Sequence, residues 1–352
     1  MEETNQELDP QNQTPNTTNE PTNADKETSN IEFKNRLDLT ELRSNMGKVK
    51  EEIGKVIVGQ NEMIDMLIAS LLAKGHSLIE GVPGVAKTIS AKLLAKTLAV
   101  DFSRIQFTPD LMPSDILGTS VFNLKTTEFE FKQGPIFSNM ILIDEINRAP
   151  AKTQAALFEV MEEQQITIDG NKYKLESPFM VLATQNPIEQ EGTYRLPEAQ
   201  LDRFLFKINV DYPNLEEEIE ILNREHKLKD ASKIEAISAF LTGKQISAYQ
   251  HLVSQVSIEE HLLSYIAQII VATRSNQFLY LGASPRASIS ILKASKAFAA
   301  MEGRDFVTPE DIKRAAIPVL HHRVIVTPER EMEGLTSNDI IKQIIEKIEI
   351  PR

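Results

Sequence analysis

The chain has 352 residues, of which 41% are hydrophobic, and a formal net charge of −13 at pH 7. This length suffices for about two domains with buried cores, and the acidity argues against a duplex-binding surface, which is normally basic. No apolar stretch approaches the roughly 20 residues of a membrane-spanning helix, and the N-terminus has no apolar signal region. The absence of cysteine excludes disulfides and thiolate metal sites. We therefore expect a globular cytoplasmic protein without direct membrane insertion.

Residues 1–32 form a separate compositional block that is rich in Asn, Thr, Glu, Gln and Pro. Up to residue 30 this block carries seven acidic side chains and one lysine, so part of the global acidity belongs to it alone. With so few large apolar residues, it cannot bury enough surface to offset the entropy of ordering. We predict a disordered, acidic and polar N-terminal tail.

The region 38–212 has the pattern of an α/β nucleotide-binding core. A helix near 60–74 precedes a short apolar strand at 77–79, which leads into the loop GVPGVAKT at 81–88. An amphipathic helix follows from Ile89 to Leu98. Strand, tight loop and helix is the arrangement of a phosphate cradle, in which backbone N–H groups and the positive helix end point at one spot.

The loop differs from the usual phosphate-binding pattern G-x-x-x-x-G-K-[ST] at Ala86, where the pattern has glycine. Gly81 and Gly84 supply the sharp turn, Lys87 would contact the β- and γ-phosphates of ATP, and the Thr88 hydroxyl would bind Mg²⁺. We expect Ala86 to be tolerated, because ordinary right-handed backbone angles suffice at the mouth of a helix. The predicted cradle consists of Gly81, Val82, Pro83, Gly84, Val85, Ala86, Lys87, Thr88 and Ile89.

Two later apolar runs end in polar side chains. The run at 140–143 is followed by Asp144 and Glu145, and the run that begins at 179 is followed by Asn186. Parallel sheets place ligands at the carboxyl ends of their strands. Asp144 would hold the metal, Glu145 would orient and deprotonate the attacking water, and Asn186 would contact the γ-phosphate or that water. The acidic pair alone could be a solvated turn, but together with the loop it predicts a phosphoryl-transfer site.

Two insertions in this core predict β-hairpins. The segment SVFNLKTTEFEFKQGP (120–135) alternates apolar and polar residues at Phe129 and Phe131, and QITIDGNKYKL (165–175) has an Asp-Gly-Asn turn between two short runs. Alternatively, both hairpins could be surface loops without a function. We favour contact with client proteins or with a central pore.

The helical pattern that follows the linker at 212–213 predicts a small all-helical lid domain over 214–326. Within it, VTPEDIKRA (307–315) begins a helix with Thr308 as the N-cap and Pro309 in the first turn. The final segment, 327–352, is charged and amphipathic, and we expect a C-terminal helix and tail.

From about Leu42 to Pro328 the chain resembles the MoxR-type AAA+ ATPases. The segments that carry the resemblance are IVGQ (57–60), GVPGVAKT, LIDEINRAPAKTQAALFEVMEE, ATQNPIEQEGTYRLPEAQLDRF and GASPRAS (282–288). It implies the helix-2-insert clade, beside magnesium-chelatase subunits and replicative helicases, with the two hairpins as the helix-2 insert and the pre-sensor-1 hairpin. The implied fold is an α/β AAA+ P-loop nucleotide domain with a parallel central sheet and β-hairpin insertions, followed by a small all-helical lid.

The resemblance also assigns roles to matching positions. Lys87 and Thr88 belong to Walker A, Asp144 and Glu145 to Walker B, and Asn186 to sensor 1.

Three arginines receive roles only through this resemblance. Arg286 would be sensor 2, reaching from the lid onto the γ-phosphate. Arg203 would be an arginine finger that projects into the neighbouring subunit, with Arg195 as its competitor and a local ion pair as the simpler reading of Arg203. The residues implied on the adenine side are Val58, Gly59 and Gln60.

The resemblance implies a hexameric ring that uses ATP and Mg²⁺ to remodel or mature partner proteins, including metal insertion into proteins with von Willebrand factor A domains. Two alternatives stay open, a nucleic-acid translocase and an ATP-gated scaffold with little turnover. Against the first, Lys125 and Lys132 of the first hairpin are offset by Glu128 and Glu130. Against the second, the pair of acids after residue 143 is intact.

Overall fold

A computed structural model describes residues 37–82, 84–187, 194–227 and 237–350. The predicted disordered tail, 1–32, lies outside the described residues, and so does Pro83 of the predicted cradle. Residues 37–352 form one compact unit. No helix in the described part of the chain is long and apolar enough to cross a membrane.

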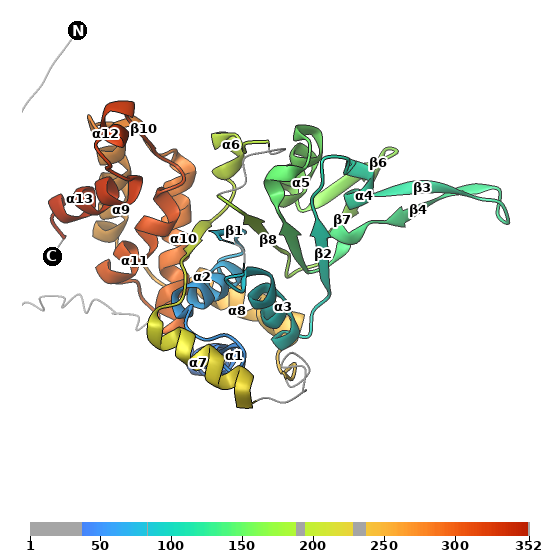
Figure 1. Cartoon of the computed structure of the whole chain (residues 1–352), viewed down its shortest axis with the longest axis horizontal. Coiled ribbons are helices and arrows are strands. Elements are labelled where there is room, and N and C mark those ends of the chain that lie inside the picture. The colour runs from blue at the N-terminus through green and yellow to red at the C-terminus, as the bar shows by residue number, and fades with distance from the viewer. Residues whose placement is uncertain (1–36, 83, 188–193, 228–236, 351–352) are drawn as a thin grey trace, which may run out of the picture. The chain divides into compact units, whose positions relative to one another are not determined.

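A five-stranded sheet lies at the centre of this unit (Figure 1), and each of its neighbouring strand pairs is parallel. Its strands are, in spatial order, β2 (Phe102–Gln106), β5 (Met140–Asp144), β8 (Met180–Gln185), β1 (Ser77–Gly81) and β9 (Phe206–Val210). The predicted parallel central sheet is confirmed. Because the strands run in one direction, their carboxyl ends, and the polar residues that follow them, lie along one edge.

The central strands β5 and β8 are apolar along nearly their whole length because both faces of the sheet are covered. Successive residues alternate between two hydrophobic clusters: Leu142 belongs to one, and its neighbours Ile141 and Ile143 belong to the other. The first cluster is covered by α1 (Thr40–Gly54), α2 (Asn61–Leu72) and α3 (Lys87–Thr97), and the second by α4 (Pro113–Leu117), α5 (Ala151–Glu163) and α6 (Glu198–Leu201). The central strands are therefore buried, and only their ends are available for chemistry.

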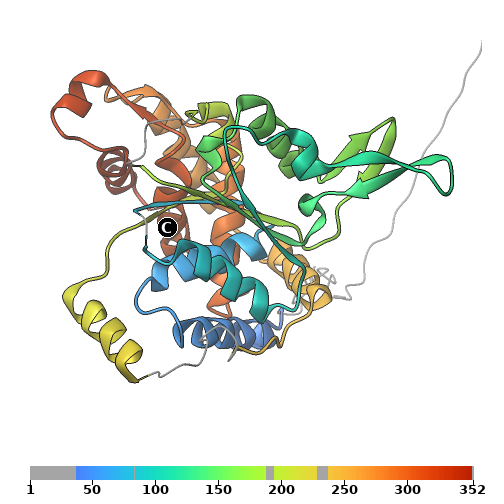
Figure 2. The ribbon, with the colours of Figure 1, turned by 45° about the vertical axis from the view of Figure 1, so that its right-hand side comes forward.

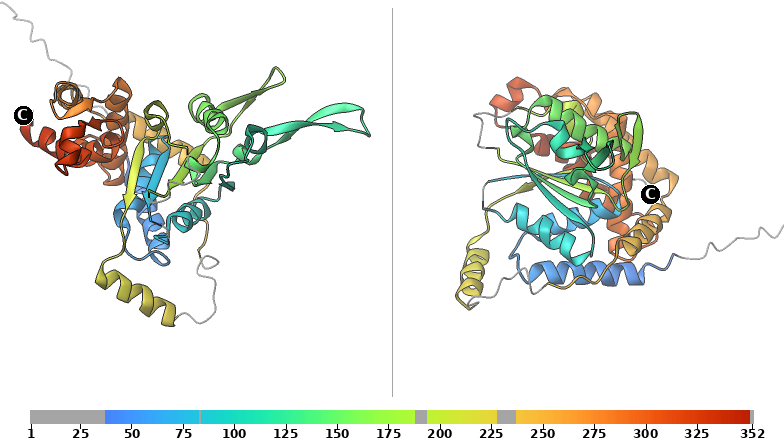
Figure 3. Two further views of the ribbon diagram at one scale, coloured as in Figure 1. Left: turned by 45° about the horizontal axis from the view of Figure 1, so that its top comes forward. Right: turned by 90° about the vertical axis from the view of Figure 1, so that its right-hand side faces the viewer.

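Both predicted hairpins are present. Strands β3 (Gly118–Asn123) and β4 (Glu128–Gln133) pair antiparallel, as do β6 (Gln165–Ile168) and β7 (Asn171–Lys174), whose turn has positive φ at Asp169 and Gly170. The hairpins project to the same side of the sheet (Figure 3, left) and contact one another. The rings of Phe131 and Tyr173 lie 4.5 Å apart, and Ser120 donates a hydrogen bond to Asp169.

The second half of the described chain is helical, as predicted. Its helices are α7 (Leu215–Lys227), α8 (Gly243–Gln255), α9 (Glu260–Arg274), α10 (Pro285–Met301), α11 (Pro309–Leu320), α12 (Pro328–Met332) and α13 (Ser337–Lys347). Thr308 precedes α11 in a capping box with Asp311, with Pro309 in the first turn, which confirms that prediction. One short antiparallel pair, β10 (Leu279–Leu281) and β11 (Ile325–Val326), lies among these helices.

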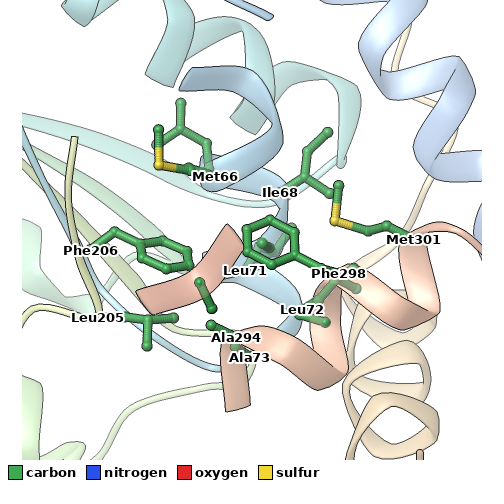
Figure 4. Packing of buried hydrophobic residues seen from close by; sticks show 14 of the residues in the cluster. Met66, Ile68, Leu71, Leu72, Ala73, Leu205, Phe206, Ala294, Phe298 and Met301 are labelled. Carbon is green, nitrogen blue, oxygen red and sulfur yellow. The ribbon is translucent and has the colours of Figure 1, made fainter. Parts of the chain in front are cut away.

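Helices α8, α9, α10, α11 and α13 share the hydrophobic core of the sheet. In Figure 4, Met66, Leu71 and Leu72 of α2 belong to the same buried cluster as Phe206 of β9 and Phe298 of α10. The rings of Phe206 and Phe298 are stacked with centroids 6.0 Å apart. Helix α7 differs, because it stands away from the sheet in Figure 2 and in both views of Figure 3.

Candidate nucleotide-binding site

Two glycines shape the loop between β1 and α3: Gly81 lets two strands approach closely, and Gly84 has a positive φ angle. A Cβ added at Gly81 would lie 2.7 Å from the carbonyl oxygen of Val210, so only glycine lets β1 run this close to the end of β9. Gly84 has φ of +90°, which a residue with a side chain rarely adopts. The side chains of Val82 and Val85 pack against the hydrophobic core.

Ala86 has a left-handed backbone conformation, with φ of 62° and ψ of 17°. Our expectation of right-handed angles at this position was therefore wrong. The residue lies outside the helix as its N-cap, where the chain must turn before the first helical residue, Lys87. An L-residue in this region costs about 1–2 kcal/mol relative to right-handed helical angles, because Cβ crowds the following carbonyl. The glycine of the usual pattern avoids that cost.

The Lys87 ammonium lies at the carboxyl ends of two adjacent strands. It donates hydrogen bonds to the carbonyl oxygens of Gly81, at the end of β1, and of Gln185, at the end of β8, the latter at 3.2 Å. These neutral acceptors hold the ammonium beside the loop. Lys87 thus links the first turn of α3 to the ends of β1 and β8.

Asp144 is 5% exposed and lies at the centre of a hydrogen-bond network at the end of β5. Its Oδ1 accepts hydrogen bonds from the hydroxyls of Thr88 (3.2 Å) and Thr184 (3.1 Å), and its Oδ2 accepts one from Nε of Arg104 (2.6 Å). The Thr88 hydroxyl and the Asp144 carboxylate, 56 positions apart in sequence, are therefore in direct contact.

Glu145 has a left-handed backbone conformation (φ 57°, ψ 55°), and its N–H donates to the hydroxyl of Thr184. Strained conformations of this kind persist where the surroundings fix them, often at functional sites. Its Oε2 accepts hydrogen bonds from Nε2 of Gln106 (3.0 Å) and pairs with Nε of Arg148 (2.7 Å). Both partners hold the carboxylate at the edge of the sheet.

These side chains line one open cleft of about 350 Å³, which we call the P-loop cleft. Its lining residues are Gly84, Ala86, Lys87, Thr88, Ile89, Arg104, Gln106, Asp144, Glu145, Thr184 and Asn186. The structure thus brings together the predicted loop, the predicted acidic pair and Asn186, which is 7% exposed.

Sequence reasoning missed four polar side chains at this site: Arg104, Gln106, Arg148 and Thr184. Arg104 and Gln106 belong to β2, and Gln106 lies in register with Asp144 on the neighbouring β5. The rule that ligands bind at the carboxyl ends of parallel strands applies to β2 as well, so the polar end of this strand was a usable signal.

Arg203 and Arg286 lie together in a second cleft of about 190 Å³. The guanidinium of Arg286 pairs with Oε1 of Glu162, and that of Arg203 pairs with Oε2 of the same carboxylate at 2.9 Å. Arg203 also donates to the carbonyl of Phe158. We call this the arginine cleft; it is lined by His76, Met161, Glu162, Asp202, Arg203, Arg286, Ile289, Ser290 and Lys293. Neither arginine is among the residues that line the P-loop cleft.

The remaining predicted residues also lie outside the P-loop cleft lining. The Arg195 side chain is 88% exposed and pairs with Glu198 at 3.4 Å. Gln60 donates through Nε2 to the carbonyl of Asp211, and the Glu217 carboxylate lies against Gly59. Val58 is half-buried in the same segment.

Comparisons with known proteins agree with this geometry. Residues 76–206 match the family described as "ATPase family associated with various cellular activities (AAA)", and residues 271–344 match the AAA lid domain. A crystal structure from Cytophaga hutchinsonii, named as a putative ATPase, superposes with a TM-score of 0.82 at 44% identity and covers 89% of this chain and 97% of that one.

Two curated relatives cover most of the chain. Uncharacterized protein YeaC from Bacillus subtilis is 45% identical over 306 residues, which is 87% of this chain and 95% of that protein. Chaperone MoxR1 from Mycobacterium tuberculosis is 41% identical over 310 residues, or 86% and 81% of the two chains. The glycine loop, the acidic pair and the helical lid thus occur in a chain that is similar to Chaperone MoxR1 along most of its length. The protein therefore belongs to the MoxR family of AAA+ ATPases.

Proposed function

We propose that the protein hydrolyses ATP with Mg²⁺ and uses the energy to remodel or mature partner proteins in the cytoplasm. The observation that carries this proposal is the contact between the Thr88 hydroxyl and the buried Asp144 carboxylate, beside Lys87 and Glu145 in one cleft. A hydroxyl and a carboxylate opposite a phosphate cradle is the arrangement that phosphoryl transfer requires.

The donor set suits Mg²⁺. This ion prefers oxygen ligands and usually keeps several waters, so it takes one or two protein oxygens together with phosphate oxygens. Thr88 and Asp144 provide such oxygens, and no group of three or more His, Cys, Asp or Glu that could form an all-protein metal cage occurs in the described part of the chain. Bound Mg²⁺ would supply charge neutralisation on the phosphates.

The chain's own residues would then divide the work. Lys87 would bind the β- and γ-phosphates in exchange for its carbonyl partners. Glu145 would orient the attacking water and accept its proton, and Asn186 would fix the γ-phosphate or the water. Gln106 would keep the Glu145 carboxylate at the edge of the cleft, 3.0 Å from its own amide.

Turnover by purified protein tests the proposal, measured as phosphate release together with binding of a fluorescent ATP analogue. Lys87→Ala should abolish binding, whereas Glu145→Gln should bind ATP normally and lose about 10²–10⁴-fold in turnover, the range for a removed general base. Normal turnover in Glu145→Gln would remove this residue from the mechanism. Normal binding without turnover in the unaltered protein would favour the scaffold alternative.

The arginine cleft supports action between subunits. Arg203 and Arg286 share Glu162 and do not line the P-loop cleft of their own chain. We propose that they serve the nucleotide of a neighbouring copy in a ring, which the family resemblance implies to be a hexamer. A guanidinium supplied between subunits is worth about 10³–10⁵ in rate.

Mixing of inactive variants tests the shared site. Subunits carrying Arg203→Ala and subunits carrying Lys87→Ala should each be inactive, and a mixture should regain turnover, because some interfaces then join an intact cradle to an intact arginine. If the two variants co-assemble without recovery, Arg203 does not act between subunits. Full activity of Arg203→Ala alone would leave Arg195 or no residue in that role.

The hairpins support a protein client. Phe122 of β3, Leu124 of the turn and Phe129 of β4 are exposed, at 46%, 85% and 74%. This apolar surface fits a client protein, and the resemblance implies proteins with von Willebrand factor A domains. Nucleic acid fits less well, because the lysines of the hairpin are matched by glutamates. Stimulation of turnover by single-stranded DNA, with a steep salt dependence, would favour the translocase instead.

A further inference from the structure

Helix α7 is amphipathic, but its apolar side faces away from the protein. Asn214 and Glu217 begin the helix as a capping box, in which each side chain accepts a hydrogen bond from the backbone N–H of the other. The half-buried residues of the helix are Glu217, Ile221 and Arg224, which share one face because they are spaced by four and three positions. A mainly polar face therefore meets the rest of the chain.

This inner face holds α7 on the segment between α1 and α2. Arg224 donates to the carbonyl oxygens of Gly54 (2.7 Å) and Lys55 (3.3 Å). The Glu217 carboxylate lies so close to Gly59 that a Cβ added there would be 2.4 Å from Oε1. The helix thus lies beside the residues that the family resemblance places on the adenine side of the nucleotide.

The opposite face carries Leu215, Ile219 and Leu222, spaced by four and three positions and therefore aligned along the helix. They are 77%, 50% and 67% exposed. We call these three residues the α7 stripe. An apolar stripe normally faces the core, and one that faces solvent indicates a contact with another surface.

We propose that the α7 stripe packs against the arginine cleft face of a second copy of this chain. Charge complementarity supports this occupant. Glu216, Glu218 and Glu225 flank the stripe and are exposed. The arginine cleft carries three cations, Arg203, Arg286 and Lys293. Of its two carboxylates, Glu162 is shared by both arginines and Asp202 is paired with Arg323 at 2.7 Å, so positive charge is in excess on this face.

Apolar complementarity supports the same pairing. Ile289 lies in the arginine cleft one turn after Arg286 on α10 and is 54% exposed. A stripe of Leu and Ile with an acidic rim therefore meets a cationic face with an exposed Ile. The stripe and the arginine face lie on different parts of the chain, so the contact is head-to-tail, as a ring requires. The inference rests on the proposed ring and adds which surfaces form it.

The double variant Ile219→Gln/Leu222→Gln tests this surface in the full chain. Glutamine keeps the helix propensity and removes the apolar contact. Assembly is followed by sedimentation velocity with Mg²⁺ and a non-hydrolysable ATP analogue. We expect the protein concentration for half-assembly to rise roughly a hundredfold, since two buried aliphatic side chains are lost. The matched control is Leu263→Gln, which removes an exposed leucine from α9 and should shift assembly less than about twofold.

Two further readouts separate the possible failures. Binding of a fluorescent ATP analogue below the assembly concentration should be unchanged. The thermal unfolding temperature of the unassembled chain should also be unchanged; a fall in it together with normal assembly would show that the stripe packs within its own chain, which overturns the inference. Normal assembly of the double variant overturns it as well. If the unaltered chain never assembles, the proposed ring and this inference both fail. The proposed ATP hydrolysis is tested separately, by phosphate release.

The pairing itself can be mapped because the chain has no cysteine. Subunits with Leu222→Cys and subunits with Ile289→Cys are mixed with the nucleotide analogue and exposed to a mild oxidant. Covalent dimers should form in the mixture and not with either variant alone. Assembled mixtures that give no covalent dimer would overturn the contact with the arginine cleft.

Discussion

Replacing Ala86 by glycine should stabilise the protein, although glycine usually weakens helices and their ends. Ala86 has φ of 62°, in the left-handed region, where an L-residue costs about 1–2 kcal/mol. Glycine removes that cost but loses about 0.5–1 kcal/mol more backbone entropy on folding than alanine does. The free energy of unfolding should therefore rise by about 0.5–1 kcal/mol.

Urea unfolding of Ala86→Gly measures this difference against two matched variants. Ala99 also has a left-handed conformation (φ 46°), so Ala99→Gly should be stabilising too. Ala155 is exposed within α5, where glycine should lower the free energy of unfolding by about 1 kcal/mol. ATP affinity should change little in Ala86→Gly, because the backbone N–H groups of the cradle are kept.

The sign of the change in the free energy of unfolding of Ala86→Gly tests this reasoning. If Ala86→Gly is destabilising by as much as Ala155→Gly, position 86 is not held in the left-handed region. If it binds ATP far more tightly than the unaltered protein, the methyl group obstructs the cradle and is not harmless to binding.

Two further predictions concern charge. Glu162→Gln removes the carboxylate shared by Arg203 and Arg286, so both guanidinium groups should bind a neighbour's phosphate more easily. The ATP concentration for half-maximal turnover should therefore fall by roughly two- to fivefold, since an exposed ion pair is worth up to about 1 kcal/mol. Glu163→Gln removes the adjacent charge without touching either arginine and should have no such effect; an equal effect would contradict the reasoning. Burial lowers the pKa of His76 to about 4, and its ring is matched to the neutral form because Nδ1 accepts from Val181 and Nε2 donates to Met161. As the pH falls below 6.5, the unfolded chain therefore takes up a proton on this histidine before the folded chain does. The free energy of unfolding is thus unaffected by His76 above that pH and falls by about 2.5 kcal/mol at pH 4.5. Urea unfolding should show a smaller decrease in His76→Gln.

The sequence predicted the elements of the P-loop cleft because each has a local signal. A glycine loop before a helix, and apolar runs that end in acids or an amide, can be read without tertiary information. Their convergence followed from one rule, that parallel strands present their carboxyl ends at one edge. Arg104 and Gln106 were missed because this rule was applied to the runs that end at 144 and 186 and not to β2, although β2 also ends in a polar residue and lies next to β5.

Two other features of the site were not predicted correctly, one because it depends on backbone conformation and one because it depends on tertiary packing. The left-handed angles of Ala86 were already indicated by the glycine of the usual pattern, and we misjudged them by placing the residue inside the helix. The pairing of Arg203 and Arg286 on Glu162 joins α5, the segment before β9 and α10. Such a contact between distant segments arises from the packing of the lid helices on the sheet, for which the sequence has no local pattern.

The charged side chains of the P-loop cleft show how phosphate itself could prepare the site for reaction. Asp144 and Glu145 are held by Arg104 and Arg148, whose side chains are 56% and 38% exposed and can therefore move without disturbing the core. Lys87 donates hydrogen bonds to the carbonyl oxygens of Gly81 and Gln185. A triphosphate in the cradle attracts all three cations. If Arg104 moved toward phosphate, the Asp144 carboxylate would be free to bind Mg²⁺. If Arg148 moved away as well, Glu145 would keep its hydrogen bond with Gln106, a neutral side chain that orients the carboxylate without neutralising it. On this reasoning, the negative charge of a bound nucleotide would free both carboxylates for the roles proposed for them.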